Sequence, residues 1–299
     1  MRARQPAPAP LPLRLLITAA TGNVGREVVR ALHRLARPDV QIGAAVRDVA
    51  PAASAFANLP GIELIRFDFA DPTTHGPALA GCQGLFLLRP PEITDTFAAL
   101  IATAKAAGVG HIVFLSVQGA GGNRFIPHHK TEQALMASGV PYTLLRPAYF
   151  MQNFNTTLRT DLVERNRVFV PAGEAVFTLV DVRDIGRVAA AVLTAPDARH
   201  HGRAYALTAR QALTFGQMAA LLSAGLGRPV AYESPSPWRF FLTKKREGLP
   251  TGFVLIMTLL HYLPRFFKTP PTTEFITEIT GQPPIEFEQF VADYRGELT

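Results

Sequence analysis

The segment from Leu15 to Leu32, LLITAATGNVGREVVRAL, constrains the fold of this chain more than any other. It opens with a short apolar run, which is typical of a buried parallel strand. A tight turn with two glycines follows, and then a helical pattern begins. The apolar residues expected on one face of that helix are Val24, Val28, Leu32 and Leu35.

The turn between this strand and this helix has the order and spacing of a phosphate-binding loop. Backbone N–H groups at a helix N-terminus point toward an anion, and missing side chains let a pyrophosphate approach. The alternative is a plain strand-to-helix turn, but the spacing of Gly22 and Gly25 favours nucleotide binding. The residues expected to contact the cofactor here are Ala19, Thr21, Gly22, Asn23, Val24 and Gly25.

Composition narrows the class of protein. With 299 residues, 48% hydrophobic and 18% charged, the chain can bury the core of one large or two modest domains. The formal charge of +7 suits an anionic cofactor, whereas the scattered basic residues and the lack of a nucleic-acid motif argue against a nucleic-acid partner. The single cysteine, Cys82, fits a reducing cytoplasm, and we expect no metal site.

Two segments bear on targeting. Residues 1–12 have no apolar core of a secretory signal, and their alternating Ala and Pro predict a disordered tail. The longest apolar run, Phe253–Leu263, is too short to span a bilayer, so we expect no transmembrane segment. It fits either a buried helix or a surface-lying one.

Short apolar runs alternate with helical patterns along the first half of the chain. This alternation predicts a doubly wound α/β fold with a parallel sheet. A helix is expected over Ile93–Ala107. Further strands are expected at Val40–Val46, Ile62–Phe67, Gly84–Leu88, His111–Ser116 and Tyr142–Leu145. Ligands bind at the carboxyl ends of such strands, so further cofactor contacts are expected from Leu88, Arg89, Ser116 and Pro147.

The second strand ends at Arg47, about 22 residues after Gly25. An acidic residue at this place holds the ribose 2′-hydroxyl of NAD, whereas an arginine favours the 2′-phosphate of NADP. No acid stands at the strand tip, and Asp48 comes only afterwards. The sequence therefore predicts a preference for NADP(H), with NAD(H) as the alternative, although Arg47 also fits an ordinary solvated arginine.

A second pattern occupies residues 127–153. It comprises His128, Lys130, Glu132, Ser138-Gly139, Tyr142-Thr143, Leu145-Arg146-Pro147, Phe150 and Asn153. This pattern resembles that of the NmrA-like family of atypical short-chain dehydrogenases, which includes quinone and triphenylmethane-dye reductases. Residues 180–185 (VDVRDI) and 280–284 (TGQPP) also fit, so the resemblance runs from Leu13 onward. It implies a Rossmann-type core with a smaller, mostly helical C-terminal subdomain.

The resemblance also implies roles for particular residues. Asp68, followed by Phe69, would lie beside the adenine, although a loop-capping role fits Asp68 almost as well. Lys130 would hydrogen-bond the nicotinamide ribose, the alternative being a surface lysine on the first turn of a helix. Ala19 replaces the first glycine of the family's GxxGxxG turn, and we expect an alanine to be tolerated there only at negative φ.

One departure from the wider superfamily concerns the chemistry. Typical short-chain dehydrogenases use Tyr-x-x-x-Lys, with the tyrosine as general acid. Here Ile126 stands four residues before Lys130 and has no proton to give. His128 could protonate a substrate near neutral pH, although a helix-capping or surface histidine is the commoner role.

The boundaries follow from these patterns: a tail over 1–12, a cofactor-binding core over 13–155 and a substrate-binding part over 156–299. A late strand near 203–207 would return to the core sheet. Aromatic residues crowd into 238–267, and we expect most of them in the core of the second part, with some facing the nicotinamide. The basic, aromatic stretch 239–246 fits a solvated helix face, with weak membrane contact second. The expected substrate contacts are Phe150, Met151 and Asn153.

These residues predict an NAD(P)H-dependent oxidoreductase that passes hydride to a planar, electron-poor acceptor such as a quinone, a dye or a conjugated alkene. Delocalisation stabilises the resulting anion, so no tyrosine acid is needed and the expected partner is a small, planar, apolar substrate. The alternative is a non-catalytic NADP-sensing regulator that binds a partner protein. The aromatic C-terminal segment, which suggests a cavity, favours the enzyme. Ile126 disfavours a tyrosine-dependent epimerase or dehydratase, and the oligomeric state stays open.

Overall fold

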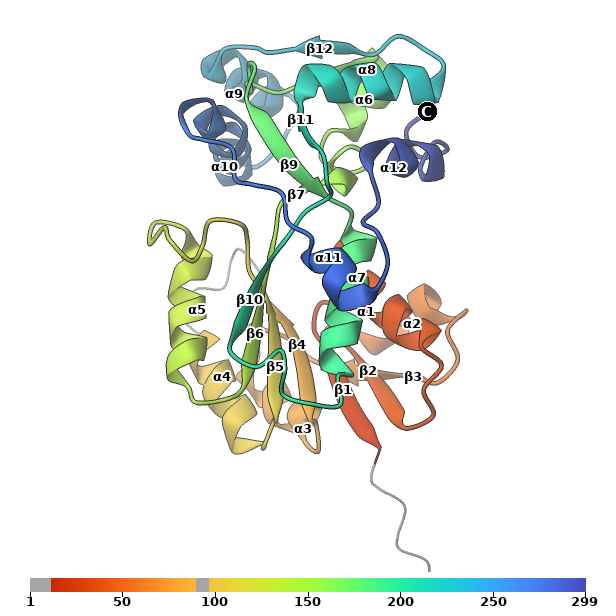
Figure 1. The fold of residues 1–299 in the computed structure, drawn as a ribbon, viewed down its shortest axis with the longest axis vertical. Helices are drawn as coiled ribbons and strands as arrows, with labels where there is room; N and C mark the ends of the chain where they lie inside the picture. The colour runs from red at the N-terminus through yellow and green to blue at the C-terminus, as the bar shows by residue number, and fades with distance from the viewer. Residues whose placement is uncertain (1–11, 90–96) are drawn as a thin grey trace, which may run out of the picture. The chain divides into compact units, whose positions relative to one another are not determined.

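The computed structural model describes residues 12–89 and 97–299, which form two compact units (Figure 1). Unit 1 comprises the described residues up to Leu145 together with Gly186–Ala204, and unit 2 comprises Arg146–Ile185 together with Tyr205–Thr299. The units divide the chain after Leu145, whereas the sequence places a boundary after residue 155 and returns a late strand near 203–207 to the core sheet. The expected tail over residues 1–11 and the expected helix start at Ile93 lie outside the described residues.

A seven-stranded sheet forms the centre of unit 1, in the order β10-β6-β5-β4-β1-β2-β3. The pairings from β6 through to β3 are all parallel. The strands are β1 (Leu13–Ile17), β2 (Val40–Val46), β3 (Ile62–Arg66), β4 (Gly84–Leu88), β5 (His111–Leu115), β6 (Tyr142–Pro147) and β10 (Arg203–Leu207). The chain winds outward in one direction from β1 and in the other from β4, so the order reverses between these two strands. The predicted doubly wound fold is confirmed.

Helices cover both faces of this sheet. They are α1 (Asn23–Arg34), α2 (Val49–Phe56), α3 (His75–Leu79), α4 (Phe97–Ala106), α5 (Pro127–Ala137) and α7 (Val182–Leu193), with a 3₁₀ turn η1 at Pro72–Thr74. Strand residues such as Leu16 and Leu85 share one buried cluster with α3, α4 and α5. Leu15, the neighbour of Leu16, points to the opposite face, where Leu193 of α7 approaches the same glycine, Gly84. Successive side chains along each strand therefore pack alternately against the helices on one face of the sheet and those on the other.

Helix α1 packs through the expected apolar stripe, with one exception. Val24, Val28 and Leu32 are buried, whereas Leu35 is 45% exposed. The helix ends at Arg34, and Leu35 is its C-cap residue, so the expectation that Leu35 belongs to the buried face is wrong. Helices α1 and α7 approach each other closely (Figure 1). A Cβ on Gly186 of α7 would lie only 2.6 Å from the backbone oxygen of Glu27 in α1, so this position has no room for a side chain.

Unit 2 is built from shorter elements. A three-stranded sheet has the order β11-β9-β7, and a two-stranded sheet pairs β12 with β8. Its strands are β7 (Tyr149–Phe150), β8 (Arg167–Phe169), β9 (Val176–Val180), β11 (Ala212–Thr214) and β12 (Ala231–Glu233). Its helices are η2 (Met151–Asn153), α6 (Arg159–Arg165), α8 (Phe215–Leu226), α9 (Pro237–Arg246), α10 (Thr251–Tyr262), η3 (Leu263–Phe266), α11 (Phe275–Thr280) and α12 (Phe287–Asp293).

The core of unit 2 is aromatic, but its aromatic residues are mostly not those expected from the sequence. Phe154, Phe215 and Phe287 are fully buried and pack on one another edge to face or tilted. Among the Trp, Phe and Tyr residues of the stretch 238–267, Phe240 belongs to this buried core. Trp238, Phe253, Phe266 and Phe267 are 42–71% exposed, so the expectation that most of this stretch forms the core is wrong.

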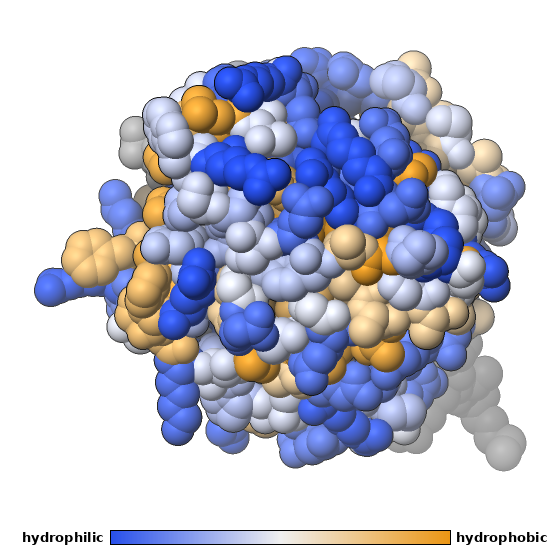
Figure 2. Space-filling view, turned by 90° about the horizontal axis from the view of Figure 1, so that it is seen from above, coloured by the Kyte–Doolittle hydropathy of each residue, from blue (hydrophilic) through white to orange (hydrophobic). Residues whose placement is uncertain are grey.

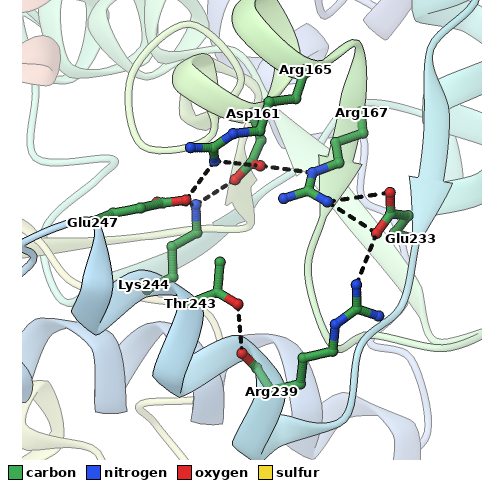
Figure 3. Close-up of polar contacts among 8 residues, drawn as sticks. All are labelled: Asp161, Arg165, Arg167, Glu233, Arg239, Thr243, Lys244 and Glu247. Carbon is green, nitrogen blue, oxygen red and sulfur yellow. Dashed lines mark hydrogen bonds and ion pairs between the residues drawn. The ribbon is translucent and has the colours of Figure 1, made fainter.

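A buried carboxylate ties α6, β8 and α9 together (Figure 3). The side chain of Asp161 is 1% exposed and accepts hydrogen bonds from Arg165 at 3.0 Å and Arg167 at 2.9 Å. It also pairs with the ammonium of Lys244, itself buried. Burial by itself would raise the pKa of Asp161, but the hydrogen bonds from Lys244, Arg165 and Arg167 lower it below its ordinary value. The carboxylate is therefore charged and fully partnered.

The cluster extends on both sides of Asp161 (Figure 3). Glu247 accepts from Lys244 at 2.9 Å and also pairs with Arg165. On the other side, Glu233 of β12 pairs with Arg167 at 3.1 Å. Charge-assisted hydrogen bonds thus connect the short elements α6, β8, β12 and α9, which share few strand pairings.

Candidate cofactor and substrate sites

The turn after β1 forms a cradle at the start of α1. The N–H of Gly22 donates to the carbonyl of Ala19 at 2.9 Å, and Gly22 is the N-cap residue with no side chain over the helix end. The first N–H groups of α1 therefore face outward without a side-chain cap, as anion binding requires. Ala19 has φ +48, so the expectation that alanine needs a negative φ here is wrong. The turn keeps the left-handed geometry and accepts the strain of a Cβ.

Gly25 is required by close packing within the cradle. A Cβ at this position would lie 2.3 Å from the carbonyl oxygen of Ala19 and 2.9 Å from that of Thr18. Any side chain would push α1 away from the strand end. Gly25 therefore sets the distance between the helix N-terminus and the turn, which is the third glycine's role in dinucleotide-binding folds.

A threonine that sequence reasoning did not single out connects the two strands at the switch point. Thr18 is fully buried, and its hydroxyl donates to the carbonyl of Phe86 at 2.9 Å. The N–H of Leu88 approaches the same hydroxyl at 3.3 Å. Thr18 thereby fixes the end of β4, where Leu88 and Arg89 are expected to contact the cofactor, relative to the cradle.

Arg47 lies at the carboxyl end of β2, directly after the last strand residue. It is exposed, and within the described part of the chain it makes no hydrogen bond or ion pair. Its neighbour Asp48 is the N-cap of α2 and makes no side-chain cap hydrogen bond. An unpaired guanidinium at this edge fits a 2′-phosphate, so the NADP preference remains the interpretation for Arg47.

Asp68 and Phe69 follow β3 in a structured loop. A carboxylate oxygen of Asp68 accepts from the N–H of Ala70 at 2.9 Å, which is the loop-capping arrangement. Phe69 is partly buried and contacts Phe67 edge to face at 5.0 Å. The loop-capping alternative therefore accounts for the geometry of Asp68, and its place beside an adenine stays a prediction.

At the end of β5, the side chain of Ser116 is buried and hydrogen-bonded to another residue of the protein. Ser116 is 1% exposed, and its hydroxyl donates to the carboxylate of Glu132, which is fully buried on α5. The pair joins the carboxyl end of β5 to the helix that carries Lys130 and His128. We interpret Ser116 as a residue that positions α5, and its role as a cofactor contact stays a prediction.

Helix α5 begins at Pro127, so Lys130 lies in its first turns, exposed and without a partner among the described residues. His128 is partly buried, with its ring 6.2 Å from that of Phe114. Burial lowers the pKa of His128 to about 4, and the positive charge of Arg89 acts in the same direction. The imidazole is therefore neutral at pH 7, which argues against the proton-donor role considered for it.

A hollow of about 330 Å³ lies beside these residues in unit 1. Its lining includes the cations Arg89, Arg124 and Lys130 and the apolar side chains of Phe97 and Ile126. Ile126, at the position of the missing tyrosine, thus lies on the wall of the same hollow as Lys130. The arrangement combines positive charge with apolar surface, and none of the described residues that line it is a tyrosine.

The three residues expected to bind substrate differ in their surroundings within unit 2. Phe150 ends β7, is partly exposed and does not belong to the buried core cluster. Met151 is fully buried in that cluster, so we do not retain it as a substrate contact. The side chain of Asn153 hydrogen-bonds to the hydroxyl of Tyr149. Pro147, expected to contact the cofactor, is buried as the last residue of β6.

Tyr149 also belongs to a buried pair that sequence reasoning missed. Its hydroxyl lies 3.0 Å from Nε2 of His261, and Nδ1 of His261 lies 2.7 Å from the carbonyl oxygen of Met257. That carbonyl can only accept, so Nδ1 carries the proton and Nε2 accepts from Tyr149. Burial lowers the pKa of His261 to about 4 and raises the pKa of Tyr149. Both groups are neutral and connect β7 to α10.

The edge of unit 1 has the features that a bound dinucleotide requires. The cradle offers uncapped helix N–H groups, a side chain at Gly25 would close it, and an unpaired arginine lies at the end of the next strand. The relevant residues follow β1, β2 and β4, on both sides of the point where the strand order reverses.

Comparison with known proteins identifies the family. The model of the NmrA-like family matches residues 13–246. The chain is 32% identical over 282 residues to an NAD(P)H azoreductase of Xenophilus azovorans, covering 92% of this chain and 96% of that protein. Among solved structures, a quinone oxidoreductase of Escherichia coli in complex with NADPH has a TM-score of 0.81 at 28% identity, covering 93% and 99% of the two chains. The triphenylmethane reductase of Citrobacter sp. with NADP(H) has a TM-score of 0.80 at 27% identity, with the same coverage.

The chain therefore belongs to the NmrA-like family, as its motifs predicted. The prediction of an NAD(P)H-dependent oxidoreductase is confirmed by these relatives. Within the described ranges, no helix combines the length and apolar composition needed to cross a bilayer.

Proposed function

We propose that this enzyme prefers NADPH over NADH and passes its hydride directly to a small, planar, electron-poor acceptor such as a quinone, a dye or a conjugated alkene. Two residues near Lys130, among those that the structure describes, carry the proposal. Ile126 has no proton to give, and His128 is neutral at pH 7. An acceptor that delocalises the incoming charge needs no acid in the hydride step and takes its proton from water afterwards.

In this proposal the cradle from Ala19 to Gly25 binds the pyrophosphate, and Arg47 binds the 2′-phosphate. Lys130 holds the nicotinamide ribose, in line with its free ammonium at the start of α5. The bound dinucleotide supplies the hydride. The protein's own contribution is orientation, since holding the reactants in line is worth several orders of magnitude in rate.

Phe150 is the strongest candidate for a substrate contact in unit 2. It is partly exposed at the end of a strand and lies outside the core cluster, so its ring has a free face for a planar acceptor. Asn153 is hydrogen-bonded to Tyr149 and would act by holding that end of β7 in place.

The test is NADPH oxidation with a panel of acceptors that differ in their need for an acid. We expect turnover with a naphthoquinone, an azo or triphenylmethane dye, or an enone, and none with a saturated ketone of similar size. Turnover of the saturated ketone would contradict the proposal, because that reaction needs a proton donor. NADPH binding without turnover of any acceptor would favour the NADP-sensing regulator instead.

A Lys130→Ala variant separates positioning from proton transfer. We expect the rate to fall about 10- to 100-fold through misplacement of the ribose. The pH–rate profile should keep its shape. Loss of an ionisation from that profile would assign Lys130 a proton-transfer role.

A further inference from the structure

Helix α10 is apolar on both of its faces. Val254, Met257, Thr258 and His261 form a buried stripe at helical spacing against the core of unit 2. The opposite face is also apolar and is 42–58% exposed; it consists of Phe253, Leu255, Ile256, Leu259 and Leu260. A helix that is hydrophobic all round is normally buried all round. The exposed face therefore lacks a partner that its composition calls for.

The apolar surface continues beyond α10. Phe266 and Phe267, which follow it, are 64% and 71% exposed. Helix α9 packs beside α10, and its Trp238 is 68% exposed and stacked on Phe241 with ring centroids 6.1 Å apart. The face of the molecule seen from above in Figure 2 is largely hydrophilic, with apolar residues scattered among the polar ones. We call residues 237–268 the α9–α10 surface.

Charge around this surface is one-sided. Residues 237–268 contain six basic residues and one acidic residue, Glu247. Glu247 is occupied by Lys244 and Arg165, and Lys244 is buried. The remaining cations include Arg246 just before α10 and Lys268 just after η3, both exposed. Two acids outside this stretch come near it: Glu233 lies 3.8 Å from Arg239, and Glu174 lines a cleft with Arg265.

We propose that the α9–α10 surface docks this enzyme on an anionic lipid bilayer. A helix with an exposed Leu, Ile and Phe face, an adjacent tryptophan and flanking Lys and Arg has the composition of an interfacial membrane anchor. Apolar side chains enter the boundary between headgroups and acyl chains, while the cations pair with anionic headgroups. A second copy of the chain fits less well, because a two-fold contact would bring the same cations face to face. This inference does not rest on the proposed function.

The single tryptophan of the chain reports on the surface directly. The full-length protein is mixed with vesicles of phosphatidylcholine, with and without phosphatidylglycerol. We expect co-sedimentation with the anionic vesicles, a blue shift of Trp238 emission and quenching by brominated lipids. Raised salt should weaken this binding, because the cationic contribution is screened.

Matched variants distinguish binding through the α9–α10 surface from nonspecific binding to vesicles. Ile256→Asp should lower vesicle binding roughly tenfold, because a charge then enters the apolar layer. Leu35→Asp is the control, since Leu35 is comparably exposed but lies in unit 1. A pair of charge variants, Arg246→Gln with Lys268→Gln, should also lower binding roughly tenfold. Arg34→Gln with Arg203→Gln removes the same charge from unit 1 and should leave binding unchanged. Melting temperature and NADPH affinity verify folding in every variant.

Three outcomes would overturn the proposal. One is the absence of binding to anionic vesicles by the folded protein. Another is equal binding by the Ile256→Asp variant and the wild type. The third is a concentration-dependent dimer in ultracentrifugation that Ile256→Asp abolishes, with no vesicle binding, which would assign the surface to a second copy.

Discussion

Positive charge is used differently in the two units. In unit 1, Arg47 and Lys130 lie exposed near the carboxyl edge of the sheet, with no partner among the described residues. In unit 2, Arg165, Arg167 and Lys244 all pair with the buried carboxylate of Asp161 (Figure 3). An unpaired cation at the edge of the sheet where ligands bind is available to a phosphate. A cation that already donates its hydrogen bonds to a buried carboxylate is not.

The difference implies separable consequences of mutation. The parallel sheet and apolar layers hold unit 1 together, so its edge cations can change without loss of the fold. Unit 2 has short strands and depends more on specific buried polar pairs. Charge changes within the Asp161 cluster of unit 2 should therefore appear as loss of stability, and those at the edge of unit 1 as loss of cofactor affinity.

The largest expected effect is that of Asp161→Asn. Removing this charge takes the buried anion away from Lys244, Arg165 and Arg167 and leaves Lys244 with Glu247 as its acidic partner, which should cost about 3–5 kcal/mol of unfolding free energy. Chemical denaturation measures this loss, and NADPH affinity of the folded fraction should be unchanged. Asp197→Asn is the control, because Asp197 pairs with Arg199 on the surface and its loss should leave the melting temperature nearly intact. Equal stability of the two variants would contradict this role of Asp161.

His261 gives unit 2 a predicted sensitivity to acid. Its folded-state pKa of about 4 lies below the ordinary value of 6.5. Between these values the unfolded chain binds a proton that the folded chain does not, so the free energy of unfolding falls as the pH falls. The contribution should be on the order of 2–3 kcal/mol between pH 6.5 and 4.5.

His111 and His128 have pKa values lowered in the same direction, so the wild type alone does not isolate His261. The informative quantity is the difference in pH dependence between the wild type and His261→Gln, measured by urea unfolding. The variant should lose less stability on acidification. Parallel pH profiles would show that His261 titrates as an ordinary histidine.

Arg47→Ala tests the edge of unit 1. Loss of a charge-assisted contact should weaken NADPH binding by about 1.5–3 kcal/mol and leave NADH binding nearly unchanged. Titration calorimetry with both cofactors measures this, and the melting temperature should not move. Arg66→Ala is the matched control, since Arg66 ends the neighbouring strand β3 but lies near Asp71. If both cofactors weaken equally, Arg47 does not read the 2′-phosphate.

The smallest expected effect concerns Phe150. If its ring is a wall for a planar acceptor, Phe150→Ala should raise KM or lower kcat by about 0.5–1.5 kcal/mol with stability nearly intact. Phe154→Ala provides the comparison, because Phe154 is fully buried and its loss should cost about 3–5 kcal/mol of stability. A large melting drop in Phe150→Ala, with unchanged relative activity across the acceptor panel, would assign Phe150 to packing.

The sequence by itself determined the fold class, the family and the position of the cradle. The strand, the glycine turn and α1 follow one another along the chain, so their geometry is set by contacts between near neighbours. The helices over Val182–Leu193 and Phe215–Leu226 likewise follow an apolar stripe at helical spacing, which is a local property of the sequence. Even here the left-handed φ of Ala19 departs from expectation, since packing around the turn outweighs the preference of a single alanine.

Only the tertiary structure decided which polar residues are partners. Lys244 meets Asp161 across 83 positions, and Tyr149 meets His261 across 112, separations over which sequence periodicity carries no information. The same holds for the aromatic stretch 238–267. Its composition predicts burial, but the exposed fraction of each side chain depends on which other elements of the fold pack against it. The small unit 2 buries Phe240 and leaves Trp238 at the surface, because a helix can turn only one of its faces toward a single core.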